Sequence, residues 1–377
     1  MGREEERRMT YINSLDIQSF RGISSLQLDQ LSSINILTGD NNSGKTSVLE
    51  VIESYSNPES LKMWGTLLRK GSSASAYSFY EGFYDLFNIN EKDKSIEYTI
   101  KSQDSISKHV VKERIRVDAR IIDEEMTESE YNQVREIVNY APSDSEEMLQ
   151  RVGKMELCIR INDSTVAKGW VYEGQRRLDT ASVGTEGKQK HNIVYIAPSS
   201  HTDADIYLTD ILKYPNLYEE MLEILKDYDE NIISINYDKG NHNYGKGIYK
   251  ILSKSYQEAL PLNVYGDGMK KAVLLMSAVL KAQDGILLLD EFETAIHTSA
   301  MSRTFRWILE TCLKLNVQVF LTSHSKEAID KVLKCSEKVR SRTAVYTLYR
   351  KKDKITVRRL SGNKALEVQD EMGLELR

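Results

Sequence analysis

The sequence of 377 residues predicts an α/β fold in which a mostly parallel sheet is flanked by helices. A glycine-rich loop at 39–46 follows an apolar, β-favouring run at 34–37 and precedes a segment with helical periodicity. Further along, apolar strands at 286–289 and 317–321 alternate with apolar helices. Such alternation is typical of parallel sheets, in which ligands bind at the carboxyl ends of the strands.

The glycine-rich loop reads Gly-Asp-Asn-Asn-Ser-Gly-Lys-Thr, a complete G-x-x-x-x-G-K-T motif. Its glycines let the backbone curl, so that successive N–H groups point at phosphate oxygens. We expect Lys45 to reach the β- and γ-phosphates and the Thr46 hydroxyl to ligate Mg²⁺. Helical spacing of apolar residues follows the loop and ends near Pro58. The positive N-terminus of this predicted helix would point at the same phosphates. The residues predicted to bind a nucleoside triphosphate here are Gly39, Asn41, Asn42, Ser43, Gly44, Lys45, Thr46 and Ser47.

Composition excludes several classes of protein. No apolar run approaches the roughly 20 residues that a membrane span needs, and residues 1–8 lack the apolar core of a signal peptide. The three cysteines are widely separated, as expected for buried thiols in a reducing cytoplasm. The net charge of −5 means that any nucleic-acid binding has to be local. We therefore expect a cytoplasmic protein that does not bind membranes.

The first predicted segment, residues 10–120, is the N-terminal part of the fold with the phosphate loop. Two strands precede the loop, and Phe20-Arg21-Gly22 marks the turn between them. Short helical and strand-like stretches follow, with strands expected at 95–100 and 110–117.

The second predicted segment, residues 121–262, is an insertion and connecting lobe. Its most polar part, 123–155, places Val134, Ile137 and Val138 at helical spacing. This spacing favours a helical insertion on the surface, and a partly disordered acidic loop is the alternative. The other elements expected here are a hairpin of strands 155–161 and 170–172, a buried strand at 193–197 and an amphipathic helix at 217–225.

The third predicted segment, residues 263–377, completes the parallel sheet. Tyr265-Gly266-Asp267-Gly268 precedes an apolar helix at 269–282. After the two apolar strands named above we expect a helix, a hairpin of strands 344–349 and 355–360, and a short tail.

Polar residues follow both apolar strands of this third segment. Asp290, at the end of the first strand, is expected to hold Mg²⁺, and Glu291 to orient and deprotonate the attacking water. His324 follows the second strand, where its side chain would lie beside the γ-phosphate; a structural histidine is the alternative.

The order of these motifs resembles that of ABC-class ATPases, and more narrowly the OLD-like branch related to RecF and the heads of SMC proteins. The resemblance implies an ABC-type P-loop head with an antiparallel β subdomain, which binds ATP and Mg²⁺ and hydrolyses ATP. In such families two heads enclose two ATP molecules, so a homodimer or a higher homo-oligomer is implied. Gly266, Asp267 and Gly268 would then contact the γ-phosphate bound to the other subunit. Arg21, from the Phe-Arg-Gly turn, would reach the nucleotide; a surface salt bridge is the alternative.

Several positions depart from the family pattern. Tyr265 stands where the usual signature has a serine, and Asp267 splits the glycines. No glutamine occurs between Lys45 and Gln103, so no glutamine loop can be assigned at the usual distance. His297 aligns with a stretch that usually crosses the dimer interface, but Thr298 replaces the proline that often follows.

The chain also lacks room for a Toprim nuclease, which members of the OLD family proper carry after the ATPase. Only 53 residues follow His324. The arrangement resembles stand-alone ATPase subunits of bacterial anti-phage systems such as PARIS. This resemblance implies a separately encoded effector, a nuclease or a toxin.

A basic segment, residues 334–359, could track a nucleic-acid backbone, and a solvated hairpin whose edge lysines block aggregation is the alternative. Three functions remain open: an ATP-driven dimeric switch, a DNA repair ATPase of the RecF/SMC type, and a non-hydrolysing nucleotide-gated scaffold. No long heptad run occurs at 56–262, which counts against the second. The ten basic residues of the segment are Lys334, Lys338, Arg340, Arg342, Arg350, Lys351, Lys352, Lys354, Arg358 and Arg359.

Overall fold

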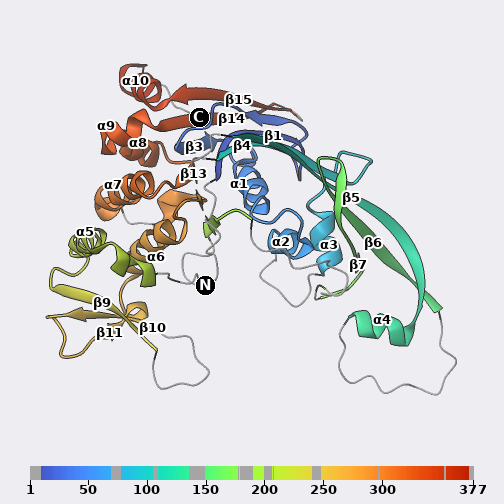
Figure 1. Cartoon of the computed structure of the whole chain (residues 1–377), viewed down its shortest axis with the longest axis horizontal. Helices are drawn as coiled ribbons and strands as arrows, with labels where there is room; N and C mark the ends of the chain where they lie inside the picture. Colours follow the sequence, from blue (N-terminus) through green and yellow to red (C-terminus); the bar gives the residue numbers. More distant parts are fainter. Residues whose placement is uncertain are drawn as a thin grey trace.

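A computed structural model places three β-sheets and their covering helices (Figure 1). It describes residues 10–68, 78–104, 109–135, 149–176, 178, 190–198, 206, 208–239, 248–295, 298–351 and 354–372. Ile137, Val138, His297 and Lys352, which the sequence singled out, lie outside the described residues. Within those ranges, no helix is long and apolar enough to cross a membrane.

The main sheet has six strands in the order β15-β14-β3-β13-β12-β8. All neighbours pair in parallel except the edge strand β15, which runs antiparallel to β14. The carboxyl ends of β3, β13 and β12 therefore meet at one edge of the sheet. The strands are β3 (Ile34–Gly39), β8 (Ile193–Ile196), β12 (Ile286–Leu289), β13 (Gln318–Thr322), β14 (Thr343–Lys351) and β15 (Lys354–Ser361).

The second sheet is antiparallel, in the order β2-β1-β4-β5-β6-β7. One buried side chain joins it to the main sheet: Gln318 accepts a hydrogen bond from the Ile12 N–H (2.8 Å) and donates to the Ile12 carbonyl (2.9 Å). Such pairing satisfies a fully buried amide with backbone groups. The strands are β1 (Thr10–Ser19), β2 (Leu26–Leu28), β4 (Ser95–Asp104), β5 (Val110–Thr127), β6 (Leu149–Ile161) and β7 (Ser164–Tyr172).

Two hydrophobic cores lie on the two faces of the main sheet. One packs α1 and the antiparallel sheet against it, and the other packs α5, α6, α7 and α8 against the opposite face (Figure 1). The longer helices are α1 (Lys45–Ser54), α5 (Pro215–Leu225), α6 (Asp267–Lys281), α7 (Thr298–Lys314), α8 (Lys326–Cys335) and α10 (Gly362–Met372). The short ones are α2 (Leu61–Thr66), α3 (Phe79–Tyr84), α4 (Glu128–Val134) and α9 (Glu337–Ser341).

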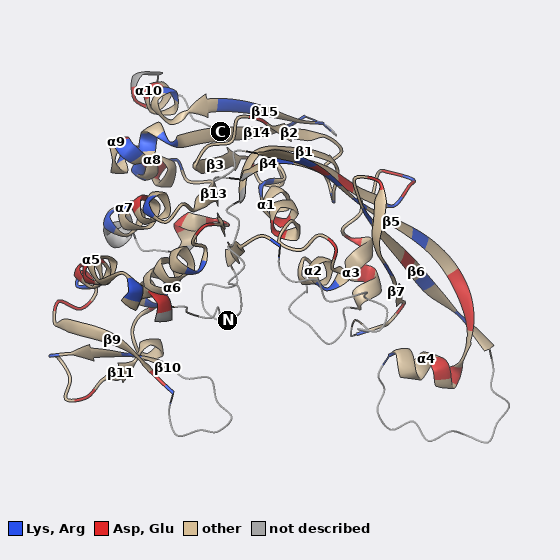
Figure 2. Ribbon diagram, in the orientation of Figure 1, with Lys and Arg blue, Asp and Glu red and all other residues tan. Residues whose placement is uncertain are grey.

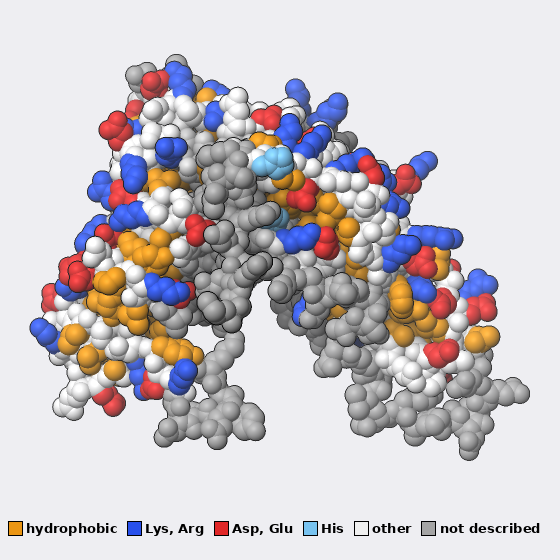
Figure 3. Space-filling view, in the orientation of Figure 1, with side chains coloured by type: hydrophobic (Ala, Val, Ile, Leu, Met, Phe, Trp, Pro, Cys, Tyr) orange, Lys and Arg blue, Asp and Glu red, His pale blue; other side chains and the backbone are white. Residues whose placement is uncertain are grey.

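A small third sheet extends the lobe that carries α5 and α6. Its strands are β9 (Ile232–Asp238), β10 (Ile248–Ser253) and β11 (Leu260–Pro261). Figure 3 shows hydrophobic side chains gathered on the surface of this lobe. Exposed large hydrophobic residues of this part of the chain are Leu212, Ile233, Tyr237, Ile248, Tyr256 and Val264.

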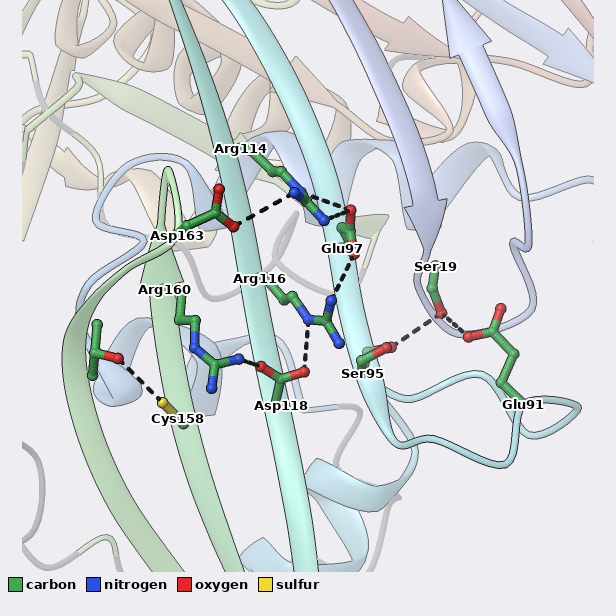
Figure 4. A network of polar contacts seen from close by, with 11 residues as sticks. Ser19, Glu91, Ser95, Glu97, Arg114, Arg116, Asp118, Cys158, Arg160 and Asp163 are labelled. Atoms are coloured by element: carbon green, nitrogen blue, oxygen red, sulfur yellow. Dashed lines mark hydrogen bonds and ion pairs between the residues drawn. The ribbon is translucent and has the colours of Figure 1, made fainter.

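The outward face of the antiparallel sheet carries a ladder of ion pairs (Figure 4). Glu97 on β4 binds Arg114 and Arg116 on β5, and Asp118 joins Arg116 to Arg160 on β6. Period-two alternation explains this ladder, because the intervening Ile115 and Val117 point into the core. Cross-strand pairs of this kind stabilise the sheet.

Most predicted elements are present, and three expectations need correction. In the described residues of the predicted helical insertion at 123–155, one helix of seven residues, α4, occurs, and the long strands β5 and β6 pair with each other as far as Thr127 and Leu149. Their polar residues occupy the exposed positions of strands rather than one face of a helix. The expected short tail includes a helix, α10. The strand predicted at 193–197 is confirmed as β8, at one edge of the main sheet.

The third correction concerns the basic segment. Lys334, Lys338 and Arg340 belong to α8 and α9, so the hairpin itself begins only at β14 (Figure 2). The Lys334 ammonium forms ion pairs with Asp330 and Asp370. The ten basic residues therefore do not form one hairpin surface.

Candidate nucleotide-binding site

The glycine-rich loop joins β3 to α1 and curls through three residues with positive φ. Gly39 has φ 137°, Asn42 has φ 64° and Gly44 has φ 98°. A Cβ atom at position 39 would lie 2.3 Å from the Leu348 carbonyl oxygen, so a side chain cannot fit there. The sequence needs these glycines for the turn and for the close approach of β14.

Lys45 lies at the centre of this curl. Its ammonium donates hydrogen bonds to the carbonyl oxygens of Gly39 (2.9 Å) and Asp40 (2.8 Å) and to the Ser43 hydroxyl (3.3 Å). Burial lowers the pKa of Lys45, although nearby carboxylates, Asp290 foremost, act in the opposite direction. These contacts hold the ammonium inside the loop, where the motif predicts phosphate binding.

The first residues of α1 also contact the end of β12. The Thr46 hydroxyl lies 2.9 Å from Asp290 Oδ2 and 3.3 Å from Oδ1. Two neighbouring ligands of an octahedral Mg²⁺ lie about 2.9 Å apart, given Mg–O distances of about 2.0–2.1 Å. A hydroxyl and a carboxylate at this separation fit the predicted Mg²⁺ site in both chemistry and spacing.

Two further side chains orient the Asp290 carboxylate. The Tyr195 hydroxyl, from β8, donates to Oδ2 at 3.2 Å, and the Thr322 hydroxyl, from the end of β13, donates to Oδ1. Burial raises the pKa of Tyr195, and Asp290 raises it further, so the phenol stays protonated. Neither residue was predicted from the sequence to belong to the site. Their positions at the ends of the two strands that flank β12 could have identified them as site residues.

Glu291 is turned out of the strand direction by a left-handed backbone, with φ 46°. Its N–H donates to the Thr322 hydroxyl at 2.8 Å, which fixes this conformation. Among the described residues, the Glu291 carboxylate forms no hydrogen bond or ion pair. It is half-buried at the same sheet edge as Lys45 and Asp290.

His324 lies just past the end of β13, the strand between β3 and β12. It is half-buried, and its backbone N–H donates to Glu293 Oε1 at 2.8 Å. The structure thus brings His324, Asp290, Glu291 and the phosphate loop to one edge. A catalytic role for His324 stays a prediction.

The residues Gly266–Gly268 lie elsewhere, at the exposed N-terminus of α6. Asp267 forms an ion pair with Lys270 (2.6 Å), and the resulting hydrogen bond lowers the pKa of Asp267. Within the part of the chain that the structure describes, no hydrogen bond joins these three residues to the phosphate loop. Their predicted contact with a nucleotide needs a second subunit and stays a prediction.

Arg21 forms an ion pair, the alternative considered above, but not at the surface. Its guanidinium lies 2.9 Å from Glu50 Oε2, and the two side chains are only 10% and 7% exposed. It also donates to the Leu67 carbonyl at 2.8 Å. Arg21 therefore anchors α1 to the chain that follows it, and a nucleotide contact stays a prediction.

Comparison with known proteins agrees with this geometry. Residues 34–330 match the family described as "AAA domain, putative AbiEii toxin, Type IV TA system". An "ATP/GTP phosphatase" of Helicobacter pylori is 23% identical over 349 residues, which cover 85% of this chain and 86% of the relative. The DNA replication and repair protein RecF of Oenococcus oeni is 52% identical over 42 residues, 11% of each chain.

The fold is also found among solved structures. An SMC head bound to the C-terminal winged-helix domain of ScpA superposes with a TM-score of 0.50 and 14% identity, over 94% of this chain and 99% of that one. The α/β fold of the chain thus resembles that of an SMC head. The chain belongs to the family described as "AAA domain, putative AbiEii toxin, Type IV TA system", whose match spans the phosphate loop, β12 and β13.

Proposed function

We propose that this protein binds and hydrolyses ATP with Mg²⁺ and acts as a dimeric, nucleotide-driven switch. The observation that carries the proposal is the meeting of Lys45, Thr46, Asp290 and Glu291 at one sheet edge, with Thr46 and Asp290 in direct contact. The similarity to an ATP/GTP phosphatase, over 85% of this chain, supports the same activity.

Each residue has a part that follows from its position. The N–H groups of the loop and the Lys45 ammonium bind the phosphates. Thr46 and Asp290 would hold Mg²⁺, which would supply charge stabilisation to the transferred phosphoryl group. The Glu291 carboxylate, which has no partner of its own among the described residues, accepts the proton of the attacking water. His324 would lie beside the γ-phosphate.

The switch requires a second copy because Gly266–Gly268 occupy an exposed helix N-terminus apart from the loop. A helix N-terminus binds anions through its free N–H groups and its dipole. In the proposed dimer, this end of α6 covers the γ-phosphate bound to the other subunit. Hydrolysis removes that phosphate and so weakens the dimer.

The output of the switch is proposed to be a separately encoded effector, a nuclease or a toxin, in bacterial anti-phage defence. The family description, which names a toxin–antitoxin system, supports this setting, as does the resemblance to the OLD-like ATPase subunits. The alternatives are a DNA repair ATPase, favoured by the short RecF similarity, and a non-hydrolysing scaffold.

Phosphate release measured with the purified protein, ATP and Mg²⁺ separates these functions. Turnover that Glu291→Gln abolishes supports the ATPase. Tight ATP binding without turnover in the wild type supports the scaffold instead. Co-purification from the native host then identifies the effector.

A further inference from the structure

Three contacts tie the hairpin formed by β14 and β15 to the phosphate loop. The Leu348 carbonyl of β14 packs against Gly39 at the start of the loop, where it excludes a Cβ atom. The Ile355 side chain of β15 lies 3.3 Å from the place of a Cβ atom on Gly44. The third contact is made by Arg350, near the end of β14.

The Arg350 guanidinium bridges two turns of the chain. Its Nη1 donates to the Asn42 carbonyl in the phosphate loop (3.1 Å), and its Nη2 donates to the Gly22 carbonyl in the turn after β1. Each carbonyl belongs to a strained turn, since Asn42 has φ 64° and Arg21, beside Gly22, has φ 49°. Left-handed residues other than glycine persist only where surrounding contacts hold them.

We infer that Arg350 is a positioning residue that fixes the phosphate loop in its phosphate-binding curl and couples the hairpin to the nucleotide site. Only the part of this inference that concerns nucleotide binding rests on the proposed function. A planar guanidinium suits this task because it presents two donors in a fixed fork. A partner that displaces the hairpin would release the Asn42 carbonyl and thereby weaken nucleotide binding.

The chain offers a matched control. Arg358, on β15, is also an exposed arginine of the hairpin, and no described residue forms a hydrogen bond or ion pair with its side chain. Arg350→Ala and Arg358→Ala therefore remove the same charge, but only the first removes the bridge. Arg350→Lys keeps the charge and loses the fork.

The test measures hydrogen–deuterium exchange of residues 39–46 without nucleotide, and then the affinity for ATP with Mg²⁺. Arg350→Ala should speed exchange in the loop and raise the Kd for ATP about tenfold, as expected for the loss of a charge-assisted hydrogen bond. Arg350→Lys should behave in the same way, and Arg358→Ala should match the wild type.

Each contrary outcome is decisive. Wild-type exchange rates in Arg350→Ala would overturn the inference, and so would equally fast exchange in Arg358→Ala. Wild-type exchange and ATP affinity in Arg350→Lys would also overturn it, because the positive charge alone would then hold the loop. A wild-type protein that binds no ATP would refute the proposed function, whereas the exchange measurement would still test the role of Arg350.

Discussion

The Thr46 hydroxyl lies 2.9 Å from the Asp290 carboxylate, although 244 residues separate the two in sequence. Thr46 lies in the first turn of α1 and Asp290 follows β12, with β13 between β12 and β3 in the sheet. This contact joins the two halves of the candidate site.

Replacing Lys45 with Ala should weaken ATP binding by about a hundredfold, because hydrogen bonds to charged groups contribute about 1.5–3 kcal/mol each. Titration calorimetry measures this change. Retained affinity in a folded variant would show that the loop does not bind phosphate through Lys45.

Glu291→Gln should preserve ATP binding and trap a closed dimer, because the amide cannot deprotonate water but leaves the loop intact. Light scattering with and without ATP measures the change in mass. The double variant Lys45→Ala, Glu291→Gln is the control and should remain insensitive to ATP. A Glu291→Gln protein whose mass never responds to ATP would argue against the two-subunit site.

Tyr195→Phe should lower kcat/KM for ATP roughly tenfold and raise the Mg²⁺ concentration needed for half-maximal turnover, because Asp290 loses a donor that orients it. Tyr346→Phe is a matched control, since its hydroxyl, in the same sheet, donates to backbone carbonyls of Asp29 and Gln30. Equal losses in both variants would indicate a general effect on the sheet.

Glu53 on α1 should make the protein less stable as the pH rises. Burial, with a smaller effect of Glu50, raises the pKa of Glu53 to about 8, above the ordinary value of 4.5. The folded state therefore holds a proton that the unfolded state loses between pH 4.5 and 8, so this contribution is full below pH 4.5 and is lost as the pH rises through 8. Thermal unfolding at pH 5 and pH 9 should show a smaller difference in Glu53→Gln than in the wild type.

Charge reversal at Lys351, Lys352 and Lys354 should leave the affinity for duplex DNA unchanged. The structure places β15 at the edge of the main sheet, as the edge-lysine alternative requires, and Arg350 and Arg359 already bind backbone carbonyls. Binding isotherms at several salt concentrations provide the measurement. A lower affinity for DNA, together with a salt dependence that corresponds to two or three fewer phosphate contacts, would favour the nucleic-acid interpretation.

Local sequence patterns predicted the strands and turns correctly where one residue type determines the backbone conformation. The glycines of 39–44 and the apolar runs before Asp290 and Thr322 gave the correct strands and turn, because backbone sterics and burial act over a few residues. In the described part of 123–155, Val134 belongs to a helix as predicted, but residues up to 127 and from 149 pair in long strands instead. The pairing of β5 with β6 depends on residues distant in sequence, and it overrides local helical spacing.

By itself the sequence determined the phosphate loop, the acidic pair after β12 and the α/β class, because each depends on short-range stereochemistry and hydrophobic periodicity. Only the tertiary structure decided that Tyr195 and Thr322 orient Asp290, that Arg21 pairs with Glu50, and that Arg350 binds the loop. These contacts join strands and turns far apart in the chain, and their geometry is set by strand order and register, which no local pattern specifies.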